Sequence, residues 1–208
     1  MILPKFYPIL DTEVSLRYGI DPVNAAQQIL DAGAQILQFR HKGFLSREAF
    51  GWLEQIAEIT RAAGTMLVVN DRADLANMFN AALHVGQDDL LPSIARRVVG
   101  SDTMIGFSTH NEGQLRAANA EPADYLALGP LFGTVTKENP DPTVGLDDFR
   151  RLRPLSKRPL VAIGGITRAN AMQAIEAGAD SVSVIGDLFP EGGNIQARIK
   201  EYLSLLTS

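Results

Sequence analysis

The chain has 208 residues, of which 46% are hydrophobic and 21% charged, and its formal net charge is −5. This is the composition of a globular domain long enough to bury its own core, and it favours one domain over residues 1–208. The sequence has no cysteine, which excludes disulfides, thiolate metal ligands and a cysteine nucleophile. Because the charge is negative and no basic block stands out, a nucleic-acid partner is not expected.

The first residues, MILPKFYPILDTE, do not combine a charged region with a long apolar run, so no signal peptide is expected. No apolar stretch approaches the roughly 20 residues needed to cross a bilayer. We therefore expect no membrane partner, and the default location is the cytoplasm. The oligomeric state is left open, with a homo-oligomer among the possibilities.

Short apolar runs rich in β-branched residues alternate along the chain with longer helical patterns. Several of them, such as MLVVN and LVAIGG, are almost continuously hydrophobic, which is typical of strands buried on both faces. Eight runs are predicted to be strands: Phe6–Asp11, Ile36–His41, Met66–Asp71, Ala82–Gly86, Met104–Thr109, Tyr125–Leu131, Leu160–Ile166 and Ser181–Gly186.

The segments between these runs have helical periodicity. The clearest predicted helices are Val23–Ala32, Arg47–Ala63 and Asn194–Leu206. Start signals precede the first two, at Asp21-Pro22 and Ser46, and glycines such as Gly64 mark helix ends.

Eight strand–helix units predict a compact (β/α)8 TIM barrel, because parallel neighbours need right-handed helical crossovers and eight such units close on themselves. An open doubly wound sheet is the alternative. The long irregular segment Phe132–Gly145 is of a length that is usually functional or mobile.

Polar and glycine residues gather at the carboxyl ends of seven predicted strands, where barrel enzymes place their active sites. In strand order they are Gln38, Arg40, Lys42; Asn70, Asp71; Gln87, Asp88, Asp89; Ser108, Thr109, His110; Thr134, Thr136, Lys137; Gly164, Gly165; and Ile185, Gly186, Asp187. The cations suit phosphate oxygens, and the carboxylates Asp71 and Asp89 suit magnesium beside a phosphate. The glycines offer backbone N–H groups to a second phosphate.

Each of these residues also has a purely structural interpretation. Arg40 and Lys42 are equally suited to surface ion pairs, and Asp71 to capping the next helix. One of Asp88 and Asp89 is expected to cap the helix that follows. His84, inside an apolar run, is interpreted as a structural histidine, whereas His110 is left between the site and the surface.

The stretches QFRHK, VVND, HVGQDD, GFSTH, LGPLFGTVTK and AIGGI together resemble the thiamine phosphate synthase family, from the second strand to the eighth. The resemblance implies a magnesium-dependent alkyl transfer that joins a hydroxymethylpyrimidine pyrophosphate to a thiazole phosphate and releases pyrophosphate. It implies Mg²⁺ as the cofactor, held by Asp71 and Asp89, and small molecules as the binding partners.

The same resemblance assigns the substrate-binding and catalytic positions. The pyrimidine pyrophosphate would be bound by Gln38, Phe39, Arg40, His41, Lys42, Asn70, Ser108 and Lys137, and the thiazole phosphate by Thr134, Val135, Thr136, Gly165, Ile185 and Gly186. Within these sets the catalytic roles would belong to Arg40, Lys42, Ser108 and Lys137. No side-chain nucleophile is needed, because the reaction requires mainly stabilisation of the leaving pyrophosphate and alignment of the thiazole nitrogen.

The chain departs from the family pattern at Gly186, where a serine is usual, and this puts its affinity for the thiazole phosphate in question. Three other functions remain open. A thiazole tautomerase of the same fold would not need the carboxylates or the QFRHK cations. A non-catalytic barrel would bind thiamine-type phosphates without turnover, and another phosphate-binding barrel enzyme would need an acid–base pair that the sequence does not supply.

Overall fold

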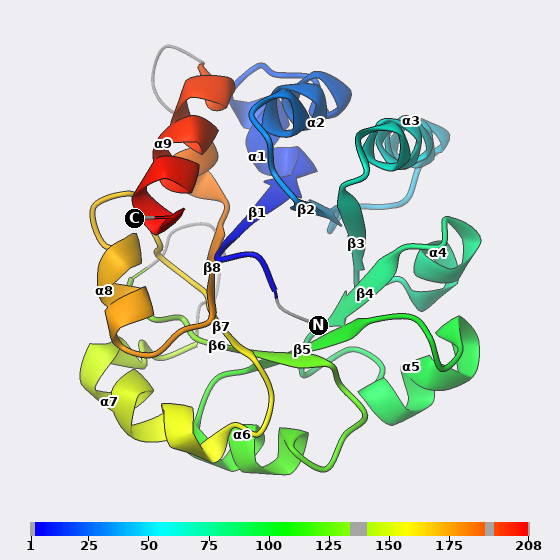
Figure 1. Ribbon diagram of the computed structural model, residues 1–208. Helices are drawn as coiled ribbons and strands as arrows, with labels where there is room; N and C mark the ends of the chain where they lie inside the picture. The colour runs from blue at the N-terminus through cyan, green and yellow to red at the C-terminus, as the bar shows by residue number, and fades with distance from the viewer. Residues whose placement is uncertain (1–2, 134–140, 190–193, 208) are drawn as a thin grey trace.

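A computed structural model describes residues 3–133, 141–189 and 194–207. Over these residues eight parallel strands form a closed barrel in the order β1 to β8, with β8 paired to β1. The predicted barrel is thereby confirmed, and the open sheet is excluded. Figure 1 looks along the barrel, with the helices arranged around the strands. None of the described helices is long and apolar enough to cross a membrane.

The strands are short and begin close to where the sequence predicts them. They are β1 Phe6–Asp11, β2 Ile36–Arg40, β3 Met66–Asn70, β4 Ala82–Val85, β5 Ile105–Thr109, β6 Tyr125–Leu128, β7 Leu160–Ala162 and β8 Ser181–Val184. The helices are α1 Thr12–Arg17, α2 Pro22–Asp31, α3 Arg47–Ala63, α4 Ala73–Met78, α5 Pro92–Val99, α6 Glu112–Ala118, α7 Gly145–Leu152, α8 Ala171–Glu176 and α9 Ile195–Thr207, with 3₁₀ turns at Arg153–Leu155 and Gly186–Leu188.

Several predicted strands extend too far at their carboxyl ends. β7 stops at Ala162 because Gly164 and Gly165 have φ of 84° and 65°, outside the range of regular strands. β3 stops at Asn70 because Asp71 has φ of 63°. The chain therefore leaves the sheet earlier than its hydrophobicity suggests, and the residues beyond each strand line the end of the barrel.

The predicted helix starts are confirmed by their capping bonds. The Asp21 carboxylate accepts from the N–H groups of Val23 and Asn24, at 2.9 and 3.0 Å, and the Ser46 hydroxyl accepts from Ala49 at 3.1 Å. The expected cap from Asp88 or Asp89 is wrong. Leu91 precedes α5 without a side-chain cap, because the Asp89 carboxylate instead accepts from the N–H of Gly86 at 2.8 Å.

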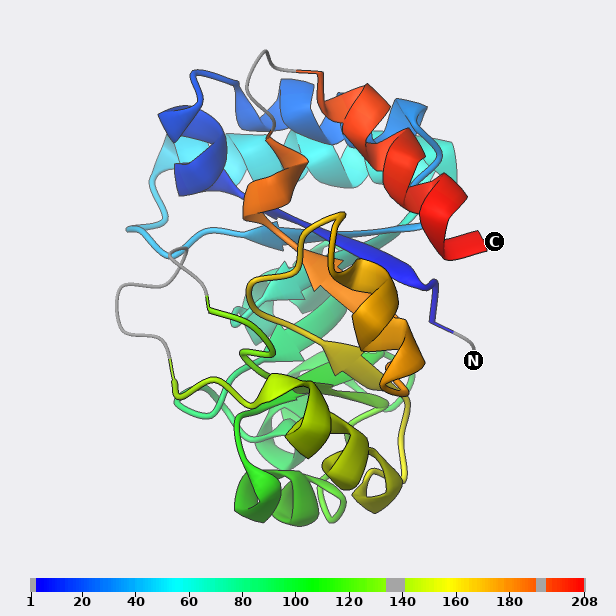
Figure 2. The same ribbon diagram turned by 90° about the vertical axis from the view of Figure 1, so that its left-hand side faces the viewer.

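Two hydrophobic layers result from alternation along the strands. Outward-facing residues pack against the helices, and inward-facing residues fill the barrel, among them Tyr7, Ile36, Val68, Tyr125 and Val161. β1 begins and α9 ends at the same end of the barrel, on the right of Figure 2. The carboxyl ends of the strands lie at the opposite end.

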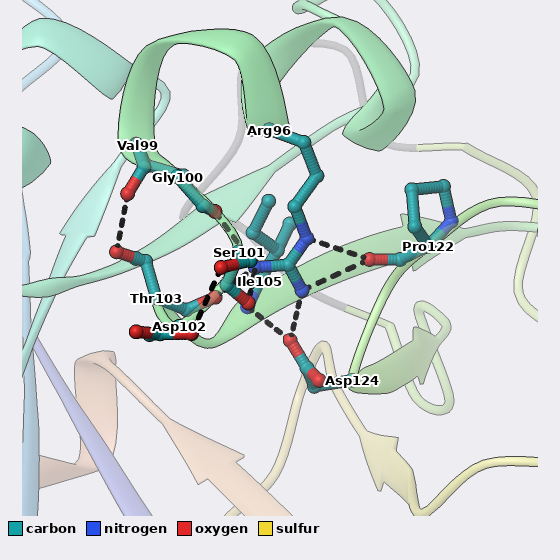
Figure 3. A network of polar contacts seen from close by, with 9 residues as sticks. All are labelled: Arg96, Val99, Gly100, Ser101, Asp102, Thr103, Ile105, Pro122 and Asp124. Atoms are coloured by element: carbon teal, nitrogen blue, oxygen red, sulfur yellow. Dashed lines mark hydrogen bonds and ion pairs between the residues drawn. The ribbon is translucent and has the colours of Figure 1, made fainter.

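A network of charged and backbone groups ties together the segments that lead into β5 and β6 (Figure 3). Arg96 of α5 donates to the carbonyl oxygens of Pro122, Gly100, Ser101 and Thr103, and to the Asp124 carboxylate at 2.6 Å. Asp124 also accepts from the N–H of Ile105 at 2.8 Å. These contacts satisfy carbonyl groups that the strands do not pair, and they hold the amino end of the barrel.

Candidate functional site

A cavity of about 570 Å³ opens at the carboxyl ends of the strands. Its size is that of a small-molecule site, and barrel enzymes bind their substrates at this end. Ten of the residues that the family resemblance assigns to the site lie on its wall: Gln38, Arg40, Lys42, Asn70, Asp71, Asp89, Ser108, Gly165, Ile185 and Gly186. Residues from distant parts of the sequence are thus brought to one site.

Two other expected site residues, Phe39 and His41, do not line the cavity. Phe39 is 3% exposed and packs between the sheet and the helices, because alternation along β2 turns it away from the barrel interior. The His41 ring contacts the Thr12 hydroxyl at 2.7 Å and Trp52, so it does not line the cavity. Thr134, Val135, Thr136 and Lys137 lie outside the described residues, so their assigned roles remain predictions.

The inner wall of the cavity contains a continuous chain of hydrogen bonds between side chains of five strands. Gln38 Nε2 donates to the Tyr7 hydroxyl at 2.8 Å, and the Tyr7 and Tyr125 hydroxyls are 2.8 Å apart. His84 Nδ1 lies 2.9 Å from the Tyr125 hydroxyl, and His84 Nε2 lies 2.9 Å from Ser108 Oγ. The chain therefore connects Gln38 with Ser108 across the barrel.

The absence of a side chain at Gly106 makes room for this arrangement. A Cβ at this position would stand 2.3 Å from the Tyr125 hydroxyl oxygen and 2.5 Å from His84 Nδ1. The Tyr125 and His84 rings stack with centroids 5.6 Å apart. A glycine on β5 is thus required for two rings from the adjoining strands to meet inside the barrel.

Burial keeps the rings of this chain uncharged. It lowers the pKa of His84 to about 4, with a smaller opposing effect from the Asp89 charge. Burial also raises the pKa values of Tyr7 and Tyr125 above the ordinary range. At neutral pH the series of hydrogen bonds between Gln38 and Ser108 therefore passes through a neutral imidazole and two neutral phenols.

Two carboxylates stand together on one side of the cavity. Asp71 pairs with the ammonium group of Lys42 and interacts with the Asp89 carboxyl. Burial, together with the hydrogen bond that Asp71 donates to Asp89 when protonated, raises the pKa of Asp71 to about 6. Asp71 does not cap α4, because its side chain is engaged with Lys42 and the flanking residue Arg72 makes no capping bond.

This pair fits a divalent cation. Two adjoining carboxylates repel each other when both are ionised, and a cation between them removes that repulsion. The described residues contain no cluster of three or more His, Asp or Glu side chains suited to a metal. Two protein carboxylates suit Mg²⁺, which keeps several waters and takes further ligands from substrate phosphates.

Arg40 is held by a buried carboxylate. Its guanidinium pairs with Asp11, which is 2% exposed and also caps α1 by accepting from the N–H of Val14 at 3.0 Å. The pair fixes the position of Arg40 at the cavity wall. Its remaining N–H donors bond no other side chain or carbonyl of the described residues and are suited to oxyanions there.

The opposite side of the cavity is built from backbone. Gly165 has φ of 65°, and a Cβ there would stand 2.4 Å from the carbonyl oxygen of Gly133. Asn170 fixes this turn by donating to the Gly165 carbonyl at 3.0 Å. The Asp187 carboxylate accepts from the N–H of Arg168 at 2.9 Å, which ties the turn after β7 to the end of β8.

Several cavity residues were not predicted as site residues from the sequence. They include Tyr7, Tyr125, Gln114 and Ser183, together with His84 and His110, whose roles the sequence left structural or open. The His110 ring contacts the Gly129 carbonyl at 2.6 Å and lies 3.6 Å from the Asp141 carboxylate. Strand alternation could have identified the two tyrosines. Tyr7 lies two residues before Ile9, and Tyr125 two residues before Ala127, so each faces the barrel interior with that partner.

The sequence comparisons with known proteins point to one family. The family model described as "Thiamine monophosphate synthase" matches residues 6–188. The chain is 45% identical to the thiamine-phosphate synthase of Koribacter versatilis, over 99% of this chain and 97% of that relative. It is 38% identical to the protein of the same name from Chloroflexus aurantiacus, over 84% and 81% of the two chains. A solved structure, thiamine phosphate pyrophosphorylase from Pyrococcus furiosus, superposes with a TM-score of 0.83 at 26% identity, covering 98% of this chain and 95% of that one.

Proposed function

Because the chain belongs to the thiamine monophosphate synthase family, we propose that it condenses 4-amino-2-methyl-5-hydroxymethylpyrimidine pyrophosphate with a thiazole phosphate. The products are thiamine phosphate and pyrophosphate. The CH2–O bond of the pyrimidine breaks, and the oxygen leaves with the electron pair. A C–N bond forms from the same CH2 carbon to the thiazole nitrogen, which becomes the cationic nitrogen of thiamine phosphate.

One observation supports this function above all: the cavity has two chemically different sides, suited to two phosphorylated substrates. Cations and carboxylates from β1 to β4 stand on one side, and glycine-rich turns after β7 and β8 stand on the other. The pyrophosphate ester fits the first side and the thiazole phosphate the second.

The leaving pyrophosphate is the group whose charge grows as the CH2–O bond breaks. Arg40 is positioned by Asp11, and Lys42 by Asp71, so both cations stand at the wall before the substrate arrives. Prepositioned cations stabilise developing charge without reorganising during the reaction. Lys137, from the sequence outside the described residues, is proposed as a third.

Magnesium is proposed as the cofactor, with Asp71 and Asp89 as its protein ligands. When bound, Mg²⁺ would neutralise pyrophosphate oxygens and so make pyrophosphate a better leaving group. Lys42, which pairs with Asp71, stands beside these ligands and would direct its ammonium group to the same pyrophosphate.

The thiazole phosphate is proposed to bind at the turns after β7 and β8. Gly165 and Gly186 leave the backbone N–H groups uncovered there, and barrels commonly bind phosphate at this place. Gly186 contributes no hydroxyl where the family usually has serine, so this chain relies on backbone donors at that position.

The test is an assay of thiamine phosphate from the two substrates, with and without Mg²⁺. We expect magnesium-dependent product, and Asp71→Ala is expected to lose most turnover. Asp74→Ala is the matched control, because Asp74 is exposed and pairs with Arg72 away from the cavity. Conversion of the thiazole phosphate alone, without the pyrimidine substrate, would instead favour the tautomerase. Binding of both substrates without product would favour a regulatory barrel.

A further inference from the structure

We propose that Tyr7, Tyr125 and His84 are positioning residues that set the direction of the hydrogen-bond chain between Gln38 and Ser108. In this arrangement His84 has its proton on Nε2, and the Ser108 hydroxyl is presented to the cavity as a donor. The proposal rests on the proposed function only where it concerns the pyrimidine substrate.

The direction follows from counting donors along the chain. Gln38 Nε2 carries only hydrogens, so it donates and the Tyr7 oxygen accepts. Tyr7 is 2% exposed, and among the described residues the acceptor for its own hydrogen is the Tyr125 hydroxyl. A buried hydroxyl without an acceptor is costly, which favours Tyr7 donating to Tyr125.

The same reasoning continues to the other end. The Tyr125 hydrogen is then directed at His84 Nδ1, which must be unprotonated to accept it. A neutral imidazole carries its single hydrogen on the other nitrogen, so His84 Nε2 donates to Ser108 Oγ. With an oxygen lone pair of Ser108 occupied by this bond, its hydroxyl hydrogen is free to turn to the cavity that Ser108 lines.

The opposite direction leaves a donor without a partner. If His84 Nδ1 carried the proton, Tyr125 would accept it and donate to Tyr7. The Tyr7 oxygen would then receive two hydrogens, from Gln38 and Tyr125, while its own hydrogen would have no acceptor among the described residues. With the Gln38 amide oriented as it is here, Nε2 toward Tyr7, this series of hydrogen bonds satisfies every hydroxyl only when it runs from Gln38 to Ser108.

The direction of these hydrogen bonds would determine which edge of a substrate ring can bind between Gln38 and Ser108. The Ser108 hydroxyl supplies a donor at one end of the chain, and the Gln38 side-chain oxygen, which does not bond Tyr7, supplies an acceptor at the other. A heteroaromatic ring with an acceptor nitrogen and an exocyclic amine on one side matches that pair. A ring held this way is fixed in its plane, which orients its reacting CH2 group.

The first experiment determines the His84 tautomer and needs no substrate. The sequence has three histidines, so long-range ¹H–¹⁵N correlation of the labelled protein at neutral pH is tractable, and His84→Gln identifies the His84 signals. We expect a neutral ring protonated on Nε2. Protonation on Nδ1 would overturn the proposal.

Two variants test the direction of the chain. Tyr7→Phe leaves the Tyr125 hydroxyl in place to donate to His84, so the tautomer is expected to persist. Tyr125→Phe removes that donor, and the two tautomers are expected to mix. An unchanged tautomer in Tyr125→Phe would show that Tyr125 does not set it. Tyr18→Phe, at a half-exposed tyrosine outside the cavity, is the matched control.

Steady-state kinetics test the positioning role. Loss of one directing hydrogen bond is expected to raise KM for the pyrimidine pyrophosphate about tenfold in Tyr125→Phe, with KM for the thiazole phosphate unchanged. An equal rise in both KM values would indicate general loosening of the barrel and contradict the proposal. If no protein forms product, the proposed function fails, whereas the tautomer measurement still decides the direction of the chain.

Discussion

The Arg96 guanidinium and the Asp124 carboxylate form an ion pair of 2.6 Å at the amino end of the barrel (Figure 3). Because the guanidinium also donates to several carbonyl groups, its removal leaves those acceptors without partners. We expect Arg96→Ala to lower the free energy of unfolding by roughly 2–4 kcal/mol, measured by urea denaturation. Arg97→Ala, at an exposed neighbour on the same helix, is expected to change it by less than about 0.5 kcal/mol. Equal losses would mean that helix propensity, not the network, determines the effect.

Gly165 allows a prediction that separates strain from crowding. Gly165 and Gly64 have nearly the same φ, 65° and 66°, but a Cβ at Gly64 meets nothing within 4 Å. Alanine at either position should therefore cost about 1–2 kcal/mol in backbone strain. Gly165→Ala additionally displaces the turn at the cavity, so we expect KM for the thiazole phosphate to rise at least tenfold in this variant alone. Similar KM values in both variants would remove Gly165 from the phosphate site.

Asp187 is predicted to stabilise the end of β8. Its carboxylate accepts from Arg198 Nη1 at 3.1 Å, from the Tyr202 hydroxyl at 2.5 Å and from the N–H of Arg168. Asp187→Asn keeps the shape but removes the charge from a partly buried ion pair, and should cost about 2 kcal/mol in thermal or urea unfolding. Tyr202→Phe removes one bond and should cost about 1 kcal/mol. A loss no larger in Asp187→Asn than in Tyr202→Phe would show that the Arg198 pair adds little.

His84 gives a prediction for stability against pH. The unfolded chain binds a proton near the ordinary pKa of 6.5, whereas the folded chain binds it only near 4. Between these values the unfolded state holds more protons, so stability falls as pH decreases from 6.5 to 4. This contribution amounts to about 3 kcal/mol. Asp71, whose pKa is raised, opposes this change, and Asp89, whose pKa is lowered, adds to it. The difference between wild type and His84→Gln is therefore the quantity to measure, without divalent cations.

The fold was predictable because its signals are local. Eight apolar runs separated by helical patterns predict a barrel, and capping residues such as Asp21 and Ser46 begin helices where the sequence says they do. The strand ends were less predictable. The hydrophobic run LVAIGG continues past the point where the backbone turns, at Gly164. The sequence does not show that this glycine adopts a positive φ.

The motifs predicted the site correctly where their residues face the barrel interior. They failed for the neighbouring motif residues that face the helices. QFRHK contains Gln38 and Arg40 on the cavity wall and Phe39 facing the helices, a difference set by strand parity. The chain from Gln38 to Ser108 depends on which strands are neighbours and on the room left by Gly106. A sequence without its topology does not show that residues as distant as Tyr7 and Tyr125 meet.

The arrangement around Arg96 has a counterpart two strands further on. Arg153 donates to the Asp180 carboxylate at 2.9 Å and to the carbonyl of Gly178, and Asp180 accepts from the N–H of Leu160, as Asp124 does from Ile105. The Arg96–Asp124 and Arg153–Asp180 networks both lie at the amino ends of strands, opposite the cavity. Mutational tolerance should therefore divide by barrel end. Substitutions at Arg96, Asp124, Arg153 and Asp180 should reduce the yield of folded protein, while those at Lys42, Asp71 and Ser108 on the cavity wall should leave abundant but inactive protein. A scan that records abundance and growth separately would map the two ends.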